Sequence, residues 1–199
     1  FTFKSVYSSA NQFIAYDGID FYIPVIEDSP QISNQNLKEN IFLNSLNEIE
    51  PVDYIIIARS DMLSEAERLA NINREFNGLN VKVVELQKIY NEFSSGNQDI
   101  SAIRNFIRYV YDNSNNNNSL KYLCLFGDAS YDYKNRIPNN TNIIPSWNSL
   151  NSFSLSSSYI SDDFFGMMDL GEGMMTNSNK LDIAVGRILA DSNTRARDL

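Results

Sequence analysis

The stretch LKYLCLFGDASYDYK, residues 120–134, decides the fold class of this chain. It opens with a nearly unbroken apolar run and then passes through Gly127 and Asp128 into a loop of small, acidic and aromatic residues. Such a run, bounded by loop signals, is typical of a strand covered by helices on both faces. In open parallel sheets, binding and catalytic residues gather beyond the carboxyl ends of the strands. The loop after residue 126 is therefore the first place to search for a function, although Gly127 and Asp128 alone are more simply explained as a turn.

The residues before this stretch repeat an alternation of strand and helix. Residues 53–58 and 79–86 predict buried strands, because both are dominated by apolar and β-branched residues. Each strand is followed by a helical pattern with candidate N-caps, Ser60 or Asp61 in the first helix and Asp99 in the second. Strands joined by helices in this order form parallel pairs with right-handed crossovers. The pattern predicts an α/β fold, a three-layer sandwich around a parallel sheet.

The apolar positions of both helices follow the helical repeat. We expect the first helix to end at Gly78, and a further strand at residues 181–185 to turn at Gly186 and Arg187. The positions expected to face the sheet are Leu63, Ala66, Leu69, Ala70, Ile72 and Phe76 in the first helix, and Ile103, Phe106, Ile107, Val110 and Tyr111 in the second.

Composition outside this pattern suggests further segments. Residues 1–26 predict a β-hairpin, either an edge hairpin or the end of an upstream β region. Residues 27–52 are polar and Asn-rich, which predicts a linker with room for one short helical turn. Residues 128–180 form a long irregular region whose aromatic residues argue against disorder. The chain has no initiating Met, and a helix that opens near Ser192 is cut short, so we expect a fragment of a longer protein.

Composition also excludes several classes of function. The net charge is −9 and no predicted face clusters Lys or Arg, which argues against nucleic acid and anionic membranes as partners. No apolar stretch approaches the roughly 20 residues of a transmembrane helix. There is no His, and the single Cys, Cys124, lies inside an apolar strand. A Cys–His, Ser–His–Asp or His-ligated metal site therefore cannot be completed by this chain alone.

Acidic residues in the long loop are the remaining candidates for chemistry. Asp128 could hold Mg²⁺ as in a phosphotransfer domain, but no second acidic cluster falls at a matching strand end. The loop after residue 58 lacks a glycine-rich phosphate-binding pattern, which disfavours nucleotide binding. Asp162 and Asp163 could orient an imidazole, bind a basic side chain or ligate Ca²⁺. From spacing alone, a turn capped by Ser161 or Asp162 is the simpler explanation.

Several motifs occur in an order that resembles the gingipain-type cysteine peptidases. Within that family the chain looks most like the sortases of the type IX secretion system of Bacteroidetes. The motifs that carry the resemblance are LKYLCLFGDASYDYKNR (120–136), IP (144–145), YISDDFFG (159–166) and DIAVGR (182–187). Shorter segments from residue 11 to residue 104 also fit, so the resemblance covers nearly the whole chain.

The resemblance implies a caspase-like fold in two side-by-side subdomains. Residues 53–136 would form the N-terminal subdomain and residues 137–199 the start of the catalytic one, whose Cys and His would lie beyond the given sequence. Asp162, and beside it Asp163, would match the acidic segment near the active site, where a carboxylate orients the catalytic His or shapes the primary pocket. Phe165 stands where gingipains usually have Tyr, which removes a hydroxyl contact.

The resemblance also implies which ions this chain would hold. Gingipains bind calcium, and Asp128, Asp132 and Asp169 are the candidates here by composition. The peptidase chemistry itself requires no cofactor.

The function implied for the parent protein is that of a cell-surface, outer-membrane-associated cysteine endopeptidase acting as a sortase. It would remove C-terminal sorting domains from secreted cargo through an acyl-enzyme and pass the acyl group to an amine of an anchoring lipopolysaccharide. Its partners would be protein substrates and other surface components of type IX secretion. The fragment alone is expected to be inactive. The alternative is a non-catalytic caspase-like scaffold that docks a partner through residues 128–180.

Overall fold

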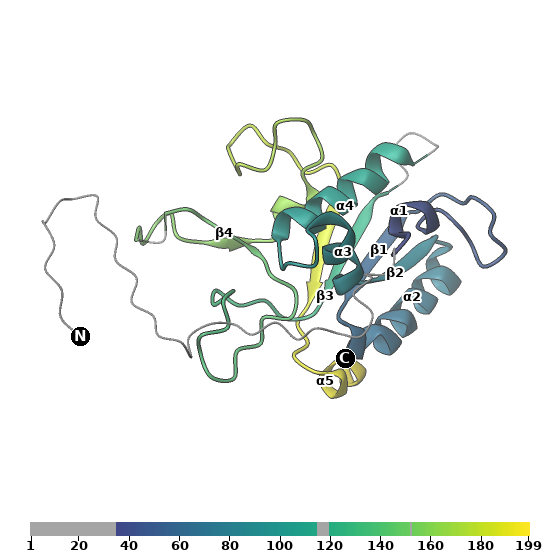
Figure 1. Ribbon diagram of the computed structural model, residues 1–199, viewed down its shortest axis with the longest axis horizontal. Coiled ribbons are helices and arrows are strands. Elements are labelled where there is room, and N and C mark those ends of the chain that lie inside the picture. The colour runs from purple at the N-terminus through teal and green to yellow at the C-terminus, as the bar shows by residue number, and fades with distance from the viewer. Residues whose placement is uncertain (1–34, 115–119, 152) are drawn as a thin grey trace, which may run out of the picture. The chain divides into compact units, whose positions relative to one another are not determined.

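The computed structural model describes residues 35–114, 120–151 and 153–199. Within these ranges, four parallel strands form one sheet in the order β2–β1–β3–β6 (Figure 1). The strands of this sheet are β1 (Tyr54–Ala58), β2 (Val81–Glu85), β3 (Tyr122–Phe126) and β6 (Ala184–Ile188). The α-helices are α1 (Leu37–Asn40), α2 (Leu63–Asn77), α3 (Leu86–Phe93), α4 (Ile100–Asn113) and α5 (Asn193–Asp198). The smaller elements are the 3₁₀ helices η1 (Ser60–Met62) and η2 (Asp163–Gly166) and the antiparallel strands β4 (Trp147–Asn148) and β5 (Ile160–Ser161).

Right-handed crossovers explain how the layers are arranged. The chain crosses the sheet in one direction from β1 to β2 and returns past β1 to β3, so the connecting helices lie on opposite faces. One face carries α2 together with α5, and the other carries α3 and α4 (Figure 1). The predicted α/β parallel-sheet sandwich is confirmed.

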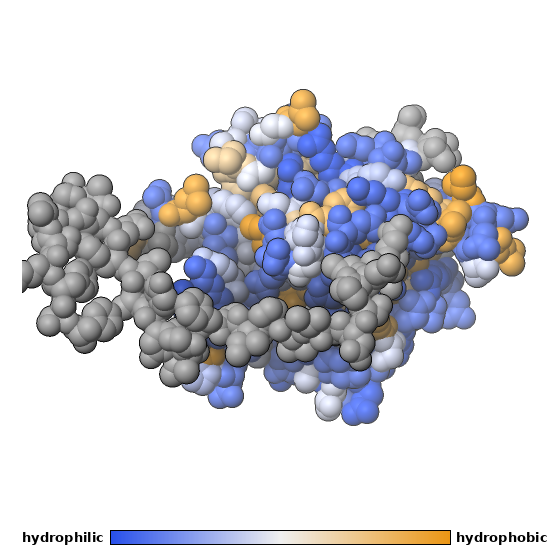
Figure 2. Space-filling view, viewed as in Figure 1, coloured by the Kyte–Doolittle hydropathy of each residue, from blue (hydrophilic) through white to orange (hydrophobic). Residues whose placement is uncertain are grey.

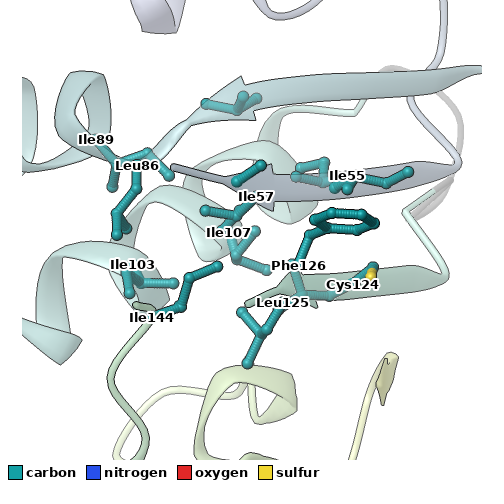
Figure 3. Packing of buried hydrophobic residues seen from close by; sticks show 14 of the residues in the cluster. Ile55, Ile57, Leu86, Ile89, Ile103, Ile107, Cys124, Leu125, Phe126 and Ile144 are labelled. Atoms are coloured by element: carbon teal, nitrogen blue, oxygen red, sulfur yellow. The ribbon is translucent and has the colours of Figure 1, made fainter. Parts of the chain in front are cut away.

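The centre of the sheet forms the core. Ile55, Ile56 and Ile57 of β1 are fully buried, as expected for a strand covered on both faces. Because side chains alternate along a strand, Leu125 and Cys124 lie on opposite sides of β3, and Leu125 shares the side of α4 (Figure 3). The buried residues of α4 include the predicted Ile103, Phe106, Ile107 and Val110, and Tyr111 is partly buried against the core.

Two sequence-based expectations about the elements need correction, and one helix was missed. The last strand begins at Ala184 and includes Gly186 and Arg187, which continue the ladder with β3 instead of turning the chain. Among the described side chains, neither Ser60 nor Asp61 caps α2, because both residues lie in the 3₁₀ turn η1. The helix α3 was not predicted, because it follows β2 without any intervening loop signal.

Two apolar residues of α2 do not face the sheet. Phe76 is 79% exposed and Ile72 is 47% exposed, while Ala66 and Ala70 carry the buried contact. Ile72 instead lines a surface cavity of about 390 Å³ between α2 and α5. The predicted end of α2 is confirmed, since Gly78 adopts the left-handed conformation with a φ of 64°.

Only some of the predicted segments lie within the residues that the structure describes. The hairpin at residues 1–26 and residues 27–34 of the linker lie outside the described residues, whereas the rest of the linker contains α1. Strands from 53–136 and from 137–199 pair in one sheet and share one core. The division of the parent protein into subdomains stays a prediction.

The surface is described by its hydropathy and by the apolar character of its helices. Figure 2 shows a mostly hydrophilic face on which hydrophobic residues are scattered. Across the described part of the chain, no helix combines the length and apolar character needed to cross a bilayer.

Candidate functional site

The segments that follow β3 and β6 meet at the carboxyl edge of the sheet. The Gly127 amide donates to the carbonyl of Ile188 at 3.0 Å, which extends the pairing of the two strands by one residue. The Asp128 carbonyl accepts hydrogen bonds from the amides of Ile143 and Ile144 at 2.9 and 3.0 Å. A distant part of the long loop is thereby fixed against the end of β3.

Gly127 is required here by close packing. A Cβ on this residue would lie 2.6 Å from Cγ2 of Ile143, far inside van der Waals contact. The backbone of the strand end can therefore approach the loop only with glycine at this position. Glycine at position 127 therefore serves both the predicted turn and the close packing against Ile143.

Arg187 joins three segments behind this edge. Its Nε and Nη2 donate to Oδ2 and Oδ1 of Asp162 at 2.8 and 2.7 Å, a bidentate ion pair. Its Nη1 donates to the carbonyls of Gly127 and Ile144, both at 2.8 Å. The Arg187 side chain is 9% exposed and that of Asp162 is 25% exposed, so the pair is largely removed from water. Charge-assisted bidentate bonds of this kind fix geometry as well as adding energy.

The two predicted carboxylates have different surroundings. Asp162 is held by Arg187, and it lies beside the end of β3 because the same guanidinium binds Gly127. Asp163 is exposed and opens η2, and its amide donates to Oγ of Ser161 at 3.1 Å. The turn expected at Ser161 is therefore present, and of the two carboxylates Asp163 is the more accessible.

A second buried arginine fixes the other end of η2. Nε and Nη2 of Arg104 donate to the carbonyl of Met167 at 2.9 and 2.6 Å, and its guanidinium lies 5.6 Å from the centre of the Phe164 ring. Burial lowers the pKa of Arg104, and the positive charge of Arg108 lowers it further. The segment from Asp162 to Met167 is thus held at one end from β6 and at the other from α4.

The beginning of β6 completes the support for η2. The Gly166 carbonyl accepts hydrogen bonds from the amides of Asp182 and Ile183 at 2.9 and 3.4 Å. A Cβ on Gly166 would lie 2.8 Å from side-chain atoms of Leu181 and Val185. These contacts leave little freedom for the position of η2, and hence for the two carboxylates at its start.

Cys124 has the character of a structural residue. Its side chain lies in the core, and burial raises the pKa of the thiol to about 11. Because the thiolate is the nucleophilic form, a thiol with such a pKa is largely unreactive at neutral pH. The interpretation of Cys124 as a buried hydrophobe is consistent with this environment.

The residues considered for calcium do not form a cluster. Oδ2 of Asp132 accepts hydrogen bonds from the amides of Arg136 and Ile137 at 2.6 and 2.7 Å, which closes a local loop. Within residues 35–114, 120–151 and 153–199, no group of three or more His, Cys, Asp or Glu residues could hold a metal ion. Calcium binding by Asp128, Asp132 and Asp169 remains a prediction without geometric support.

Neither Arg104 nor Arg187 was predicted to take part in the site. The sequence does contain a hint for Arg104, because this basic residue lies directly beside the apolar positions of α4. Arg187 was quoted within the motif DIAVGR, but its partner Asp162 lies 25 residues away and is chosen by the packing of η2 against β6.

Comparisons with known proteins indicate the family to which this chain belongs. The model of peptidase family C25 matches residues 47–199. Among solved structures, dimeric latent PorU from Porphyromonas gingivalis is similar at 32% sequence identity with a TM-score of 0.59. The match covers 76% of this chain but only 15% of that PorU chain, and a search of the curated proteins found no match. This chain belongs to peptidase family C25, the gingipain family of cysteine peptidases.

Proposed function

We propose that this chain supplies the scaffold and a supporting carboxylate of a gingipain-type cysteine endopeptidase, whose catalytic Cys and His come from outside these 199 residues. The chain's own composition supports this division, because it contains no His and its one Cys is buried. The carrying observation is the ion pair that holds Asp162 beside Gly127 at the carboxyl edge of the sheet. In open α/β folds that edge is where sites are assembled.

In the proposed enzyme a thiolate attacks the scissile carbonyl, an imidazole transfers protons, and backbone amides stabilise the oxyanion. Asp162 acts as a positioning residue, since both of its oxygens bind Arg187. Asp163 has the exposed carboxylate and is the better candidate to contact the imidazole or a basic substrate side chain. Both carboxylates therefore contribute, one by fixing the segment and the other by contact.

At the level of the parent protein, we assign the role of a type IX secretion sortase. It removes C-terminal sorting domains from cargo at the cell surface and transfers the acyl group to an anchoring lipopolysaccharide. The support is the likeness to PorU together with the order of motifs in the sequence. No cofactor enters the chemistry, and any bound calcium would have a structural role.

Peptide cleavage by the full-length protein that contains this chain tests the proposal. We expect it to cleave a quenched fluorescent substrate that spans the junction between cargo and sorting domain, and the 199-residue chain alone to be inactive. Asp163→Asn should lower kcat/KM by about a hundredfold or more, the low end of what loss of a group assisting proton transfer causes. Asp112→Asn, at the far end of α4, is the matched control and should leave cleavage unchanged.

A non-catalytic scaffold is the second candidate. The observation that favours it is again the absence of His from the sequence together with a thiol whose pKa is raised to about 11. A full-length protein that binds cargo but leaves it uncut under all conditions would select the scaffold and reject the peptidase.

A further inference from the structure

A long uncharged stretch of the chain surrounds the strands β4 and β5. Residues 137–161 contain no Asp, Glu, Lys or Arg, although these residues make up 21% of the whole chain. The loop that joins the two strands, residues 149–159, lies inside this stretch and is called the β4–β5 loop below. Figure 1 shows the segment that follows β4 extending away from the central sheet. The loop takes no part in the ion pair between Arg187 and Asp162, so the site described above does not explain it.

The β4–β5 loop presents large apolar side chains to solvent. Leu150 is 87% exposed, and Phe153 and Leu155 are as exposed as they would be in an extended peptide. Single exposed apolar residues are common, but several in one loop indicate a surface that contacts an apolar partner. No charged residue stands between them or beside them in the sequence.

The loop pairs several of its backbone groups internally. The Ser154 amide donates to the carbonyl of Asn151 at 3.2 Å, and the amides of Ser157 and Ser158 donate to the carbonyl of Ser154 at 3.3 and 2.9 Å. Oγ of Ser154 accepts a further hydrogen bond from the Ser157 amide at 3.2 Å. Backbone groups that are already paired can leave water at a much lower cost than unpaired ones.

Two aromatic residues lie at the base of the loop. The rings of Trp147 and Tyr159 are in contact, with their centres 5.6 Å apart. The Ser149 amide donates to the Tyr159 carbonyl at 3.0 Å, which closes the base. Trp and Tyr are enriched where a protein crosses from lipid to water, because each has an apolar ring and a polar group. An apolar loop above an aromatic base is the order of side chains that such a boundary requires.

These features favour a lipid surface over a protein partner. A specific protein interface uses about 20–30 residues on each side, whereas this loop offers three large apolar side chains. Partial insertion into a bilayer needs only an apolar surface and the absence of charge, because a charged group is costly to bring among acyl chains. The net charge of −9 further indicates an uncharged lipid surface, since anionic headgroups would repel the chain.

We propose that the β4–β5 loop inserts Leu150, Phe153 and Leu155 into the boundary between headgroups and acyl chains of a zwitterionic lipid surface. The proposal goes beyond the proposed function, which places the parent protein at a cell surface without naming a lipid contact. It does not depend on peptidase activity, so a failure to bind lipid would leave the cleavage prediction untouched.

The single Trp of the chain makes the contact measurable. Trp147 lies at the base of the loop, so its fluorescence reports on the surroundings of this loop. The 199-residue chain is titrated with phosphatidylcholine vesicles whose acyl chains carry bromine, which quenches nearby Trp. We expect saturable quenching with brominated vesicles and none with unbrominated ones. Addition of phosphatidylglycerol should not strengthen binding, and high salt should not weaken it, because the contact is apolar.

Substitutions in the loop test which side chains insert. The double variant Phe153→Ser, Leu155→Ser should weaken vesicle binding by about tenfold or more, since burial of one such side chain already supplies that much. Because both side chains are exposed, the melting temperature should be unchanged. Phe76→Ser is the matched control, because Phe76 is also exposed but lies on α2 beside Arg74 and Glu75. This variant should bind vesicles like the unchanged chain.

Sedimentation velocity without lipid tests the alternative that the loop joins two copies of the chain. We expect the same sedimentation for the unchanged chain and the double variant. A dimer that the double variant disrupts would overturn the proposal in favour of self-association. Absence of Trp147 quenching, binding that requires phosphatidylglycerol, or an equal loss in Phe76→Ser would each overturn it as well.

Discussion

At the scale of single residues, Arg187 connects the strand end at Gly127, the loop at Ile144 and the carboxylate of Asp162. Asp162 was expected from the resemblance to be a supporting carboxylate, and in the structure it lies beside the end of β3, but the arginine that holds it there was not predicted. Such partners are chosen by tertiary packing between residues far apart in sequence, and spacing along the chain carries no record of that choice.

Loss of this arginine should be strongly destabilising. Arg187→Met leaves Asp162 largely buried without its partner, so we expect the free energy of unfolding to fall by about 3 kcal/mol. Urea unfolding followed by circular dichroism measures the change. Arg197→Met, at an exposed arginine whose nearest carboxylate contact is 3.9 Å, is the control and should change stability by less than about 0.5 kcal/mol. Equal effects of the two variants would show that the buried pair contributes nothing.

Buried acidic groups predict a loss of stability at alkaline pH. Burial raises the pKa of the Cys124 thiol to about 11, and it also raises the pKa values of the Tyr54 and Tyr90 hydroxyls. These groups ionise more readily in the unfolded chain, which therefore binds fewer protons than the folded one at alkaline pH. The contribution of Cys124 is complete below a pH of about 9 and is lost as pH rises toward 11, while the contributions of the two tyrosines are lost over a higher range. Urea midpoints should fall across that window, and an unchanged midpoint would contradict the burial of these groups.

At the scale of elements, the positions of the two long helices were predicted well, whereas a short helix and the limits of a short strand were not. The face of α4, its cap at Asp99 and the end of α2 at Gly78 follow from local rules and are confirmed. The start of β6 was missed, because the limits of a short strand depend on its neighbour in the sheet. The helix α3 was missed because it follows β2 without an intervening loop signal. Pairing with β3 sets the register of β6 and brings Gly186 and Arg187 into the strand.

The tight packing of η2 leads to a prediction with a matched control. Gly166→Ala would place a methyl group within 2.8 Å of Leu181 and Val185 and within 2.9 Å of the Ile183 carbonyl, so we expect a loss of about 1–3 kcal/mol of stability. Gly186→Ala, in the neighbouring strand, meets no described atom within 4 Å and should be nearly neutral. Thermal unfolding of the two variants compares them directly. A neutral Gly166→Ala would mean that η2 is free to shift away from β6.

At the scale of the whole molecule, the α/β class and the parallel sheet followed from the alternation of apolar strands and helices, and the family followed from the order of motifs. Which residues would assemble into a working site could not be predicted, because the described carboxylates depend on Arg104 and Arg187 for their positions. The chain is a scaffold that fixes one carboxylate and exposes another, and we propose that the nucleophile comes from sequence outside these residues.

Covalent labelling of the full-length protein tests most directly whether the nucleophile lies outside this chain. The protein is treated with a peptidyl acyloxymethyl ketone, a reagent that alkylates catalytic cysteines, and the modified residue is located by tandem mass spectrometry. We predict one modified cysteine outside this chain, with Cys124 unmodified because its thiol is buried and its pKa is raised to about 11. Modification of Cys124 in the folded protein would contradict the account, and so would a protein with no reactive cysteine at all.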